Sequence, residues 1–369
     1  MTKLEHLYGY YGQSPWLDNL TRAYLSDGTL GRMVANGIRG VTANPSIFAR
    51  SISGSHEYDE QFAALMAAGK SVDEAYWEMV ISDAGQALTV LRPVFDGGDC
   101  IDGFVSVEVS PELAHDAPAT IAAARWLRRR MDQPNLLVKI PATAEGVTAV
   151  ETLTAEGSSI NVTLLFSLTR YAEIIEAYLC GLERFSANGG DPSTVSSVAS
   201  FFVSRVDTEV DHRLESLGTD EALALRGQAA VAQAKLAYRL FAEQFCTERW
   251  HRLASLGADL QRPLWASTST KNPHDRDTRY VEELIGPDTV TTLPEATIAA
   301  FEDHGTMART VDTGVPQAAE LMLRLAAVGV DMTAVGRTLE DNGIASFNKA
   351  YHDVLANLAA TKQPPAPAR

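Results

Sequence analysis

The sequence predicts an α/β protein built as a closed (β/α)8 barrel, in which eight parallel strands are surrounded by helices. Eight short apolar runs recur along the 369 residues, and amphipathic or Ala-rich stretches typical of helices separate several of them. No Ser/Gly-rich linker and no shift in composition divides the chain. Strands that alternate with helices favour parallel βα units, and eight such units close a barrel.

The strands follow from apolar runs that contain many β-branched and aromatic residues. We predict them at PWLDNL (15–20), RGVTAN (39–44), GFVSVEV (103–109), NLLVKIPA (135–142), SINVTLLFS (159–167), SSVASFFV (196–203), RPLWAST (262–268) and DTVTTLP (288–294). An open doubly wound sheet is the alternative fold. It is disfavoured because neither a GxGxxG nor a GxxxxGK[ST] phosphate loop follows the early strands.

Helices are predicted from caps and periodicity. Ser71 and Glu74 form a capping box that opens a helix over 71–91, with Pro93 just beyond its end. Further helices are expected over 112–130, 168–182, 219–253, 317–327 and 332–358.

The chain is longer than the roughly 250 residues typical of this barrel. We place the surplus as extra helices between strands 2 and 3, between strands 6 and 7, and after strand 8. The sequence therefore predicts a single domain over 1–362 and a disordered, Pro-rich tail over 363–369.

Charge and composition limit the partners and the compartment. The chain carries 31 Lys and Arg against 47 Asp and Glu, a net charge of −16. The electrostatic field of this negative charge repels nucleic acid and anionic membrane surfaces. A phosphorylated ligand would therefore need cations placed locally at its binding site. There is no apolar run of membrane-spanning length, no secretory signal pattern and no CxxC among the three cysteines. We expect a cytoplasmic protein.

Alternation along the strands brings a set of polar side chains into the barrel. Glu108, Lys139, Asn161 and Thr163 lie on the strand faces opposite the uniformly aliphatic ones. We expect the aliphatic faces to meet the helices and these four residues to point into the lumen. Active sites of this fold lie at the carboxyl ends of its strands.

Lys139 is the most informative residue, because it alone among seven lysines lies inside a continuous apolar run. Burial favours the neutral amine, and a neutral amine can attack a carbonyl to form a Schiff base. Two structural alternatives remain open at this point. The lysine could extend to solvent from the strand end, or it could form a buried ion pair with Glu108.

Other candidates surround the same end of the barrel. Asp18 and Glu108 supply two carboxylates for acid/base chemistry, although a helix cap and a salt bridge would explain them equally. Asn44 precedes a proline, so a turn is its structural alternative. Arg205 and Lys271 follow strands 6 and 7, where many barrels bind phosphate, but lone cations there are usually just solvated.

The eight histidines show no spacing typical of metal ligands, so we predict no metal and no cofactor.

Two segments, GVTANPSIF (40–48) and LLVKIPATAEGVTAVETL (136–153), resemble the transaldolase family in its long bacterial form. That family consists of class I, Schiff-base enzymes on a (β/α)8 barrel, and the resemblance extends from about residue 18 to the helices after strand 8. The family's Schiff-base lysine matches Lys139. Ala43 stands where a hydroxyl residue is more often found.

Shorter segments extend the resemblance residue by residue: WLDNL, VSVEVSP, INVTLLFS, SFFVSR and STSTKNP. The resemblance implies catalytic roles for Lys139, Asp18, Glu108 and Thr163. It implies substrate binding by Asn44, Asn161, Ser200, Phe202, Arg205 and Lys271. Lys271 stands where many relatives have arginine. Lysine keeps the positive charge of arginine but cannot form the bidentate contact of a guanidinium.

The implied reaction moves a dihydroxyacetone unit from sedoheptulose 7-phosphate to glyceraldehyde 3-phosphate in the pentose phosphate pathway. The resemblance implies sugar phosphates as ligands, no cofactor, and a monomer or homodimer. Fructose-6-phosphate aldolases, which release free dihydroxyacetone, are an alternative. The resemblance implies that they are shorter chains and that they carry a tyrosine at the position where this sequence has Phe202. A fusion with a sugar-phosphate isomerase would need a longer chain. A non-catalytic sugar-phosphate-binding barrel is also conceivable, but Lys139, Asp18 and Glu108 together argue against it.

Overall fold

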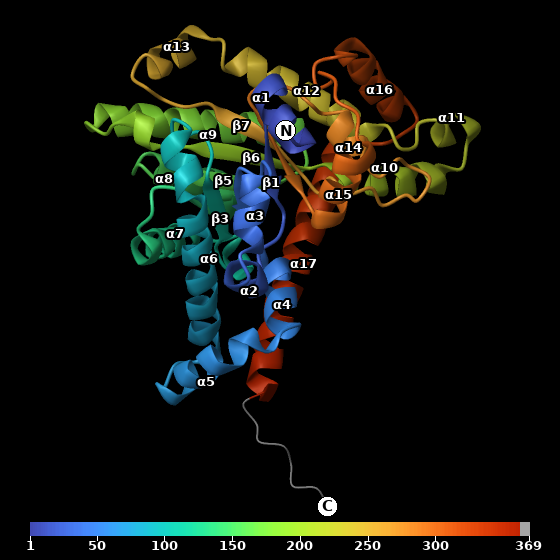
Figure 1. The fold of residues 1–369 in the computed structure, drawn as a ribbon. Helices are drawn as coiled ribbons and strands as arrows, with labels where there is room; N and C mark the ends of the chain where they lie inside the picture. Colours follow the sequence, from blue (N-terminus) through green and yellow to red (C-terminus); the bar gives the residue numbers. More distant parts are fainter. Residues whose placement is uncertain (362–369) are drawn as a thin grey trace, which may run out of the picture.

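The strands of the computed structural model, which describes residues 1–361, form one closed barrel in the order β1 to β8 (Figure 1). Every neighbouring pair is parallel, and β8 pairs with β1 to complete the ring. The strands are β1 (Gln13–Leu17), β2 (Gly40–Thr42), β3 (Phe104–Glu108), β4 (Leu136–Pro141), β5 (Ile160–Leu165), β6 (Ser197–Phe202), β7 (Gln261–Ala266) and β8 (Thr289–Leu293). Each coincides with a predicted run within one or two residues at most boundaries, so the predicted fold class is confirmed.

The helices surround the barrel and include additional ones in the three predicted places. They are α1 (Lys3–Tyr11), α2 (Arg22–Ser26), α3 (Thr29–Ala35), α4 (Pro45–Ser53), α5 (Asp59–Ala67), α6 (Val72–Gly97), α7 (Ala117–Met131), α8 (Ala144–Thr154), α9 (Leu168–Ala187), α10 (Val203–Leu217), α11 (Asp220–Leu223), α12 (Ala229–Gln244), α13 (Glu248–Ala254), α14 (Arg279–Glu282), α15 (Glu295–His304), α16 (Val315–Ala327) and α17 (Met332–Thr361). The predicted tail over 363–369 lies outside the described residues.

The start of α6 agrees with the sequence, but its predicted end is wrong. The Ser71 hydroxyl accepts from the Glu74 amide, and the Glu74 carboxylate accepts from the Ser71 amide, which is a complete capping box. The helix then continues through Pro93 to Gly97. A proline inside a helix costs about 3 kcal/mol. Leu91 and Phe95 on either side of it are buried, and each contributes about 1.5–3 kcal/mol, which offsets that cost.

Two other predicted helices are shorter than expected because caps interrupt them. The stretch predicted over 219–253 divides into α11, α12 and α13, with Gly227 in the left-handed region between the first two. Thr247 then caps α13 by accepting from the Trp250 amide. Similarly, Asp116 accepts from the Ala119 amide, so α7 begins at Ala117 rather than near residue 112.

A buried ionic cluster fills the barrel at the amino ends of the strands. The Asp102 carboxylate accepts hydrogen bonds from Ser14, Trp16, Arg39 and Arg262. Burial alone would raise the pKa of Asp102, but the Arg262 and Arg39 guanidinium groups and the Ser14 hydroxyl outweigh it and hold this pKa below its usual value. This end of the lumen is therefore closed by paired charges.

The last helix, α17, runs alongside α4 and reaches the rim of the barrel (Figure 1). Its Gly343 packs against Leu164 of β5, where an added Cβ would lie 2.9 Å from the Leu164 Cδ2 atom. Leu164 has a φ of 57° and marks a shift in the β5–β6 register. The contact with α17 thus braces a backbone conformation that non-glycine residues seldom adopt.

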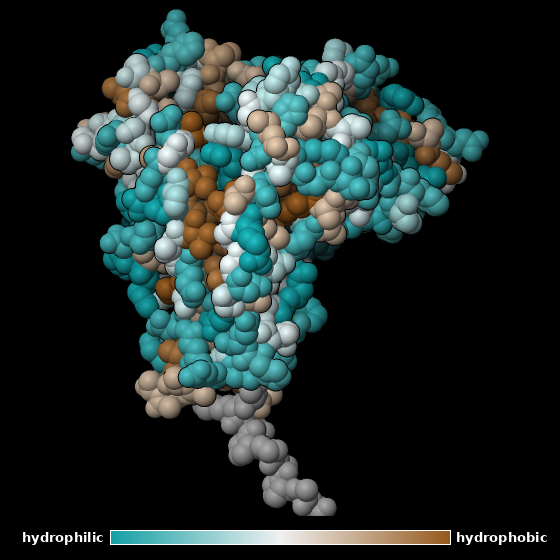
Figure 2. Space-filling view, viewed as in Figure 1, coloured by the Kyte–Doolittle hydropathy of each residue, from teal (hydrophilic) through white to brown (hydrophobic). Residues whose placement is uncertain are grey.

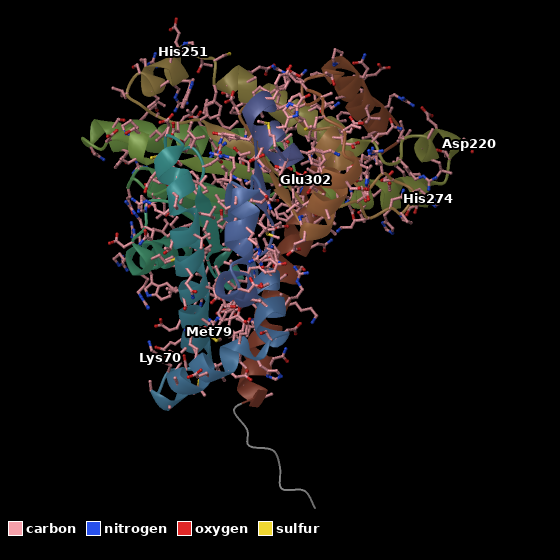
Figure 3. All side chains as sticks on the ribbon, viewed as in Figure 1. Lys70, Met79, Asp220, His251, His274 and Glu302 are labelled. Carbon is pink, nitrogen blue, oxygen red and sulfur yellow. The ribbon has the colours of Figure 1, made fainter. Side chains whose placement is uncertain are left out.

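The outer surface agrees with the acidic composition. The face shown in Figure 2 is mainly hydrophilic, with apolar residues in narrow strips between helices. Side chains such as Asp220, His251 and His274 project outward, whereas Met79 of α6 is buried (Figure 3). Among the helices of residues 1–361, none has both the length and the apolarity that crossing a membrane requires.

Candidate active site

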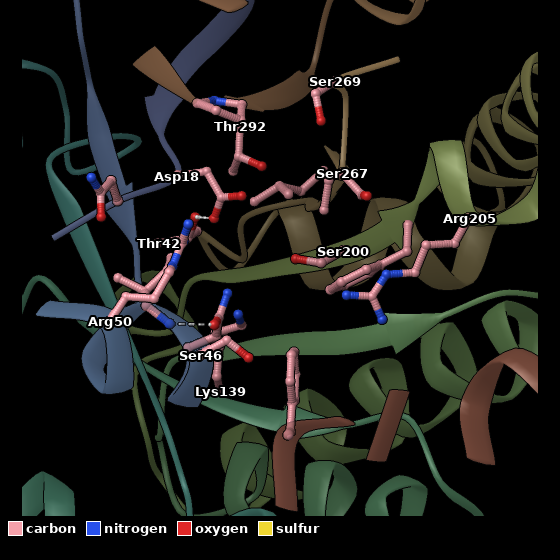
Figure 4. A pocket seen from close by; sticks show the side chains of 18 of the residues that line it. Asp18, Thr42, Ser46, Arg50, Lys139, Ser200, Arg205, Ser267, Ser269 and Thr292 are labelled. Carbon is pink, nitrogen blue, oxygen red and sulfur yellow. Dashed lines mark hydrogen bonds between the residues drawn. The ribbon is translucent and has the colours of Figure 1, made fainter. Parts of the chain in front are cut away.

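A cavity of about 390 Å³ opens at the carboxyl ends of the strands, opposite the ionic cluster. Residues from β2, β4, β6, β7 and β8 line it, together with side chains of α4, α10 and α17. Figure 4 shows Lys139 and Asp18 in its middle, with Arg50 and Arg205 approaching from opposite sides. The position matches the end of the barrel at which enzymes of this fold carry their active sites.

Lys139 lies on β4, and its side chain is only 4% exposed. Its Nζ donates to the carbonyl oxygen of Ala43 at 3.3 Å and lies 3.4 Å from Oε2 of Glu108. The ion pair that the sequence left open is therefore present, yet the lysine also lines the cavity. The amine can meet a ligand without leaving its buried position.

Glu108 lies directly across from Lys139 in the β3–β4 register. Burial raises the pKa of Glu108, and the Lys139 cation opposes this rise. Among the described residues, neither Glu108 carboxylate oxygen nor the Thr163 hydroxyl has a hydrogen-bond partner. Neither residue is part of the cavity lining, so both lie below its surface. Buried polar atoms without protein partners are typical of places that hold an ordered water.

Asp18 follows β1 and lines the cavity. The Thr42 hydroxyl donates to its Oδ1 at 3.0 Å. Burial raises the pKa of Asp18, while the Lys139 cation, the Thr42 hydrogen bond and the Arg50 and Arg205 cations oppose the rise. Asp18 and Glu108 are thus two carboxyl groups that share one lysine, with Asp18 on the cavity surface and Glu108 beneath it.

Asn44 is both a helix cap and a lining residue of the cavity. Its Oδ1 accepts from the Ile47 amide at 3.0 Å, which caps α4. The residue also lines the cavity. Its structural role as a cap therefore fixes an amide group at the rim of the site.

A chain of hydrogen bonds runs beneath the cavity from β6 to β3. The Ser200 hydroxyl donates to Oδ1 of Asn161 at 2.7 Å, and Nδ2 of Asn161 donates to the Ser106 hydroxyl at 2.9 Å. All three are buried, and Ser200 alone among them lines the cavity. Asn161 therefore orients Ser200 from below rather than lining the cavity itself.

Arg205, at the start of α10, is a cation without a hydrogen-bond partner among residues 1–361. Its Cζ lies 4.9 Å from the centroid of the Phe202 ring, which holds the guanidinium over an aromatic face. Burial lowers the pKa of Arg205, and the carboxylates of Asp18 and Glu108 oppose this effect. An unpaired guanidinium in a cavity wall is suited to bind an anion.

Lys271 lies in the exposed loop after β7, and its Nζ donates to the Ser269 hydroxyl at 2.8 Å. Both residues line the same cavity as Arg205. The two cations expected from the sequence therefore border one space, although Lys271 lies at its outer edge.

The sequence reasoning missed eight polar residues and one aromatic residue of the lining: Asn19, Thr42, Ser46, Arg50, Ser267, Ser269, Thr292, Glu295 and Phe347. Spacing could have indicated two of them. Ser269 is two residues from Lys271 in the same loop after β7, and Arg50 is one turn after Ser46, which follows the candidate Asn44 by two residues. Phe347 arrives from the last helix, and no local pattern signals its position.

Comparison with known proteins agrees with this arrangement. Residues 15–358 match the family model described as transaldolase/fructose-6-phosphate aldolase. The chain is 47% identical over 352 residues to Transaldolase 1 of Streptomyces avermitilis, covering 95% of this chain and 93% of that protein. It is 48% identical over 350 residues to the transaldolase of Thermobifida fusca, covering 94% of this chain and 95% of that protein. The chain belongs to the transaldolase/fructose-6-phosphate aldolase family.

Proposed function

We propose that the protein is a transaldolase, which moves a dihydroxyacetone unit from sedoheptulose 7-phosphate to glyceraldehyde 3-phosphate. The products are erythrose 4-phosphate and fructose 6-phosphate. The observation that carries this proposal is the buried amine of Lys139 at the wall of a cavity that also holds Asp18 and the unpaired Arg205. These groups supply a nucleophile, a proton acceptor and an anion-binding cation in one space.

The first step is attack of the neutral Lys139 amine on the C2 ketone of the donor. The carbinolamine that forms must lose water, which requires one proton to reach its hydroxyl oxygen. Glu108 delivers this proton through a water held at the unpaired Thr163 hydroxyl. Its raised pKa suits this task, because it keeps a proton available on the carboxyl group.

The second step breaks the C3–C4 bond. The iminium on Lys139 accepts the electron pair of that bond, and Asp18 accepts the proton of the C4 hydroxyl as the aldose leaves. The three-carbon unit remains on Lys139 as an enamine or carbanion. Attack on the acceptor aldehyde reverses these steps, and Asp18 returns its proton to the new C4 oxygen.

Substrate binding divides between two parts of the cavity. Asn44 and Ser200 hold hydroxyl groups of the three-carbon unit, and Asn161 fixes Ser200 from below. Arg205 and Lys271 hold the phosphate, which supplies the local cations that an acidic protein needs. Lysine contributes charge but no bidentate fork, so Arg205 carries most of the geometric selectivity.

Phe202 favours transfer over release of free dihydroxyacetone. Release requires a proton at the nucleophilic carbon of the intermediate. Phe202 can donate none, and its ring packs against Phe166 with 5.5 Å between centroids. Position 202 therefore supplies no proton to the intermediate, and an acceptor aldehyde captures the intermediate instead.

Donor consumption with and without an acceptor tests this proposal. Fructose 6-phosphate alone should give only slow release of dihydroxyacetone. Addition of erythrose 4-phosphate should accelerate consumption by orders of magnitude and yield sedoheptulose 7-phosphate. Equal rates without an acceptor would identify an aldolase, and binding without turnover would identify a non-catalytic barrel.

The remaining proposals concern the setting of the enzyme. We place it in the cytoplasm, as a monomer or homodimer that acts on small sugar phosphates and binds no nucleic acid. Its net charge of −16 supports the last point.

A further inference from the structure

Arg50 of α4 lines the catalytic cavity but has no function in the reaction described above. Its guanidinium makes no hydrogen bond or ion pair with another side chain of the described residues, although the residue is exposed at the cavity mouth. Figure 4 shows it pointing toward Asp18, on the side of the cavity opposite Arg205.

We propose that Arg50 is a positioning residue that keeps the Asp18 carboxylate ionised and ready to accept the C4 hydroxyl proton. This inference rests on the proposed function, because it assumes that Asp18 is the proton acceptor. It adds a residue outside the matched motifs to the groups that govern the cleavage step.

The charges around Asp18 explain why such a residue is needed. The groups that lower the pKa of this carboxyl come from four elements, and all of them line the cavity: Thr42 of β2, Lys139 of β4, Arg50 of α4 and Arg205 of α10. Lys139 must be uncharged when it attacks the ketone. Arg205 is neutralised when it binds the substrate phosphate. The iminium that forms next carries a positive charge, but it loses this charge as the C3–C4 bond breaks. Arg50 is then the facing cation that keeps its charge, without a bound phosphate, through both steps.

Glu295 is a second carboxylate of the cavity lining whose charge Arg50 affects. Asn19 and Tyr24 both donate to Oε1 of Glu295, which fixes this carboxylate in the cavity lining. Burial alone would raise the pKa of Glu295, but the hydrogen bonds from Asn19 and Tyr24 and the Arg50 cation hold it below its usual value. Arg50 thus faces two carboxylates, Glu295 at the rim and Asp18 inside.

The same two carboxylates argue against Arg50 as a second phosphate site. Arg50 lines the cavity together with Asp18 and Glu295, whose negative charges would oppose a phosphate there, whereas Arg205 is less exposed and is backed by the Phe202 ring. The phosphate therefore favours the Arg205 side, and Arg50 acts on a protein group rather than on the substrate.

The first test is the pH profile of donor cleavage. Without the cation, Asp18 holds its proton to higher pH, so Arg50→Gln should move the midpoint of the acidic limb of kcat/KM upward by about half to one pH unit. Below that midpoint the rate should fall about three- to tenfold, and Arg50→Lys should restore most of it. Arg92→Gln, which removes an exposed arginine of α6 outside the cavity, is the matched control and should change nothing. An unmoved limb in Arg50→Gln would overturn the proposal.

The second test separates an effect of Arg50→Gln on Asp18 from an effect on Lys139, because the lost positive charge could act on either group. Free dihydroxyacetone forms a Schiff base with the lysine but has no C3–C4 bond to break. Borohydride trapping of this adduct should therefore proceed at the same rate in Arg50→Gln and in the unmodified protein. Equal slowing of trapping and cleavage would show that Arg50 acts on Lys139, and the inference would be wrong.

Asp18→Asn distinguishes failure of this inference from failure of the proposed function. Loss of cleavage in Asp18→Asn, together with an unmoved limb in Arg50→Gln, would refute the role of Arg50 alone. Full cleavage activity in Asp18→Asn would refute the assignment of Asp18 on which the inference rests.

Discussion

The Nζ of Lys139 lies 3.4 Å from Oε2 of Glu108, and the parallel register places the two residues side by side on neighbouring strands. A pair of this kind can exchange a proton without large movements. When the carboxyl holds the proton, the amine is neutral and nucleophilic. Because burial raises the pKa of Glu108, the low-polarity interior favours the protonated carboxyl, which leaves the amine free to attack.

Replacement of Lys139 by alanine should abolish turnover, because no other lysine of the described residues lines the cavity except Lys271 at its outer edge. Borohydride with fructose 6-phosphate should add a reduced three-carbon unit to the peptide that contains Lys139, as measured by mass spectrometry. Lys235→Ala is the matched control, because Lys235 is also largely buried but pairs with Glu283 outside the cavity. An adduct on another lysine would contradict the assignment.

Replacement of Glu108 by glutamine should change how stability depends on pH. The folded-state pKa of Glu108 is raised, so the folded protein binds this proton more tightly than the unfolded chain does. That contribution is fully present below the unfolded-state pKa of about 4.3 and is lost as the pH rises through the folded-state value. The variant should therefore gain unfolding free energy relative to the unmodified protein as the pH rises above about 4.3, as measured by urea denaturation. A difference that is independent of pH would show that Glu108 does not titrate there.

Replacement of Arg205 by alanine should raise KM for phosphorylated donors far more than for unphosphorylated fructose. A charge-assisted hydrogen bond contributes about 1.5–3 kcal/mol, which corresponds to a factor of about 10 to 100. Steady-state kinetics with both donors give the comparison, and equal effects would assign Arg205 a structural role only. Lys271→Arg is the companion variant, since a bidentate fork should tighten phosphate binding if the loop accommodates it.

Removal of metal ions should leave the rate unchanged, because an iminium on Lys139 supplies the electron sink that a metal would otherwise provide. Within residues 1–361, no group of three or more His, Cys, Asp and Glu side chains is placed to hold a metal ion. Extended dialysis against a chelator, followed by assays with and without divalent cations, measures this directly. A large loss that a divalent cation restores would point to a metal-dependent aldolase.

Replacement of Gly343 by valine should impair both stability and substrate binding. A side chain at this position meets Leu164 at 2.9 Å and approaches the Arg205 guanidinium at 3.7 Å. Overpacking of this kind costs about 1–3 kcal/mol. Thermal unfolding and KM report the two effects. Gly85→Ala is the matched control, because Gly85 lies within α6 with no atom near its Cβ position, and alanine there should stabilise the helix by about 0.5–1 kcal/mol.

Most of the barrel could be predicted from the sequence, because alternation and apolar runs are local signals of strands. The same alternation placed Lys139 beside Glu108 in the lumen, as the β3–β4 register shows. The features that could not be predicted depend on contacts between residues far apart in the chain. The burial of Leu91 and Phe95 carries α6 past Pro93, and Phe347 reaches the cavity only because α17 packs along the barrel.

The closure of β1 against β8 also bears on how the protein is made. A ribosome synthesises Asp18 early, but β1 lacks its second neighbour until Thr289–Leu293 has emerged, and Phe347 follows later still. The nascent chain therefore cannot assemble a complete catalytic cavity, and β1 presents an unpaired edge for most of its synthesis. The catalytic cavity can therefore form only after most of the last helix has left the ribosome.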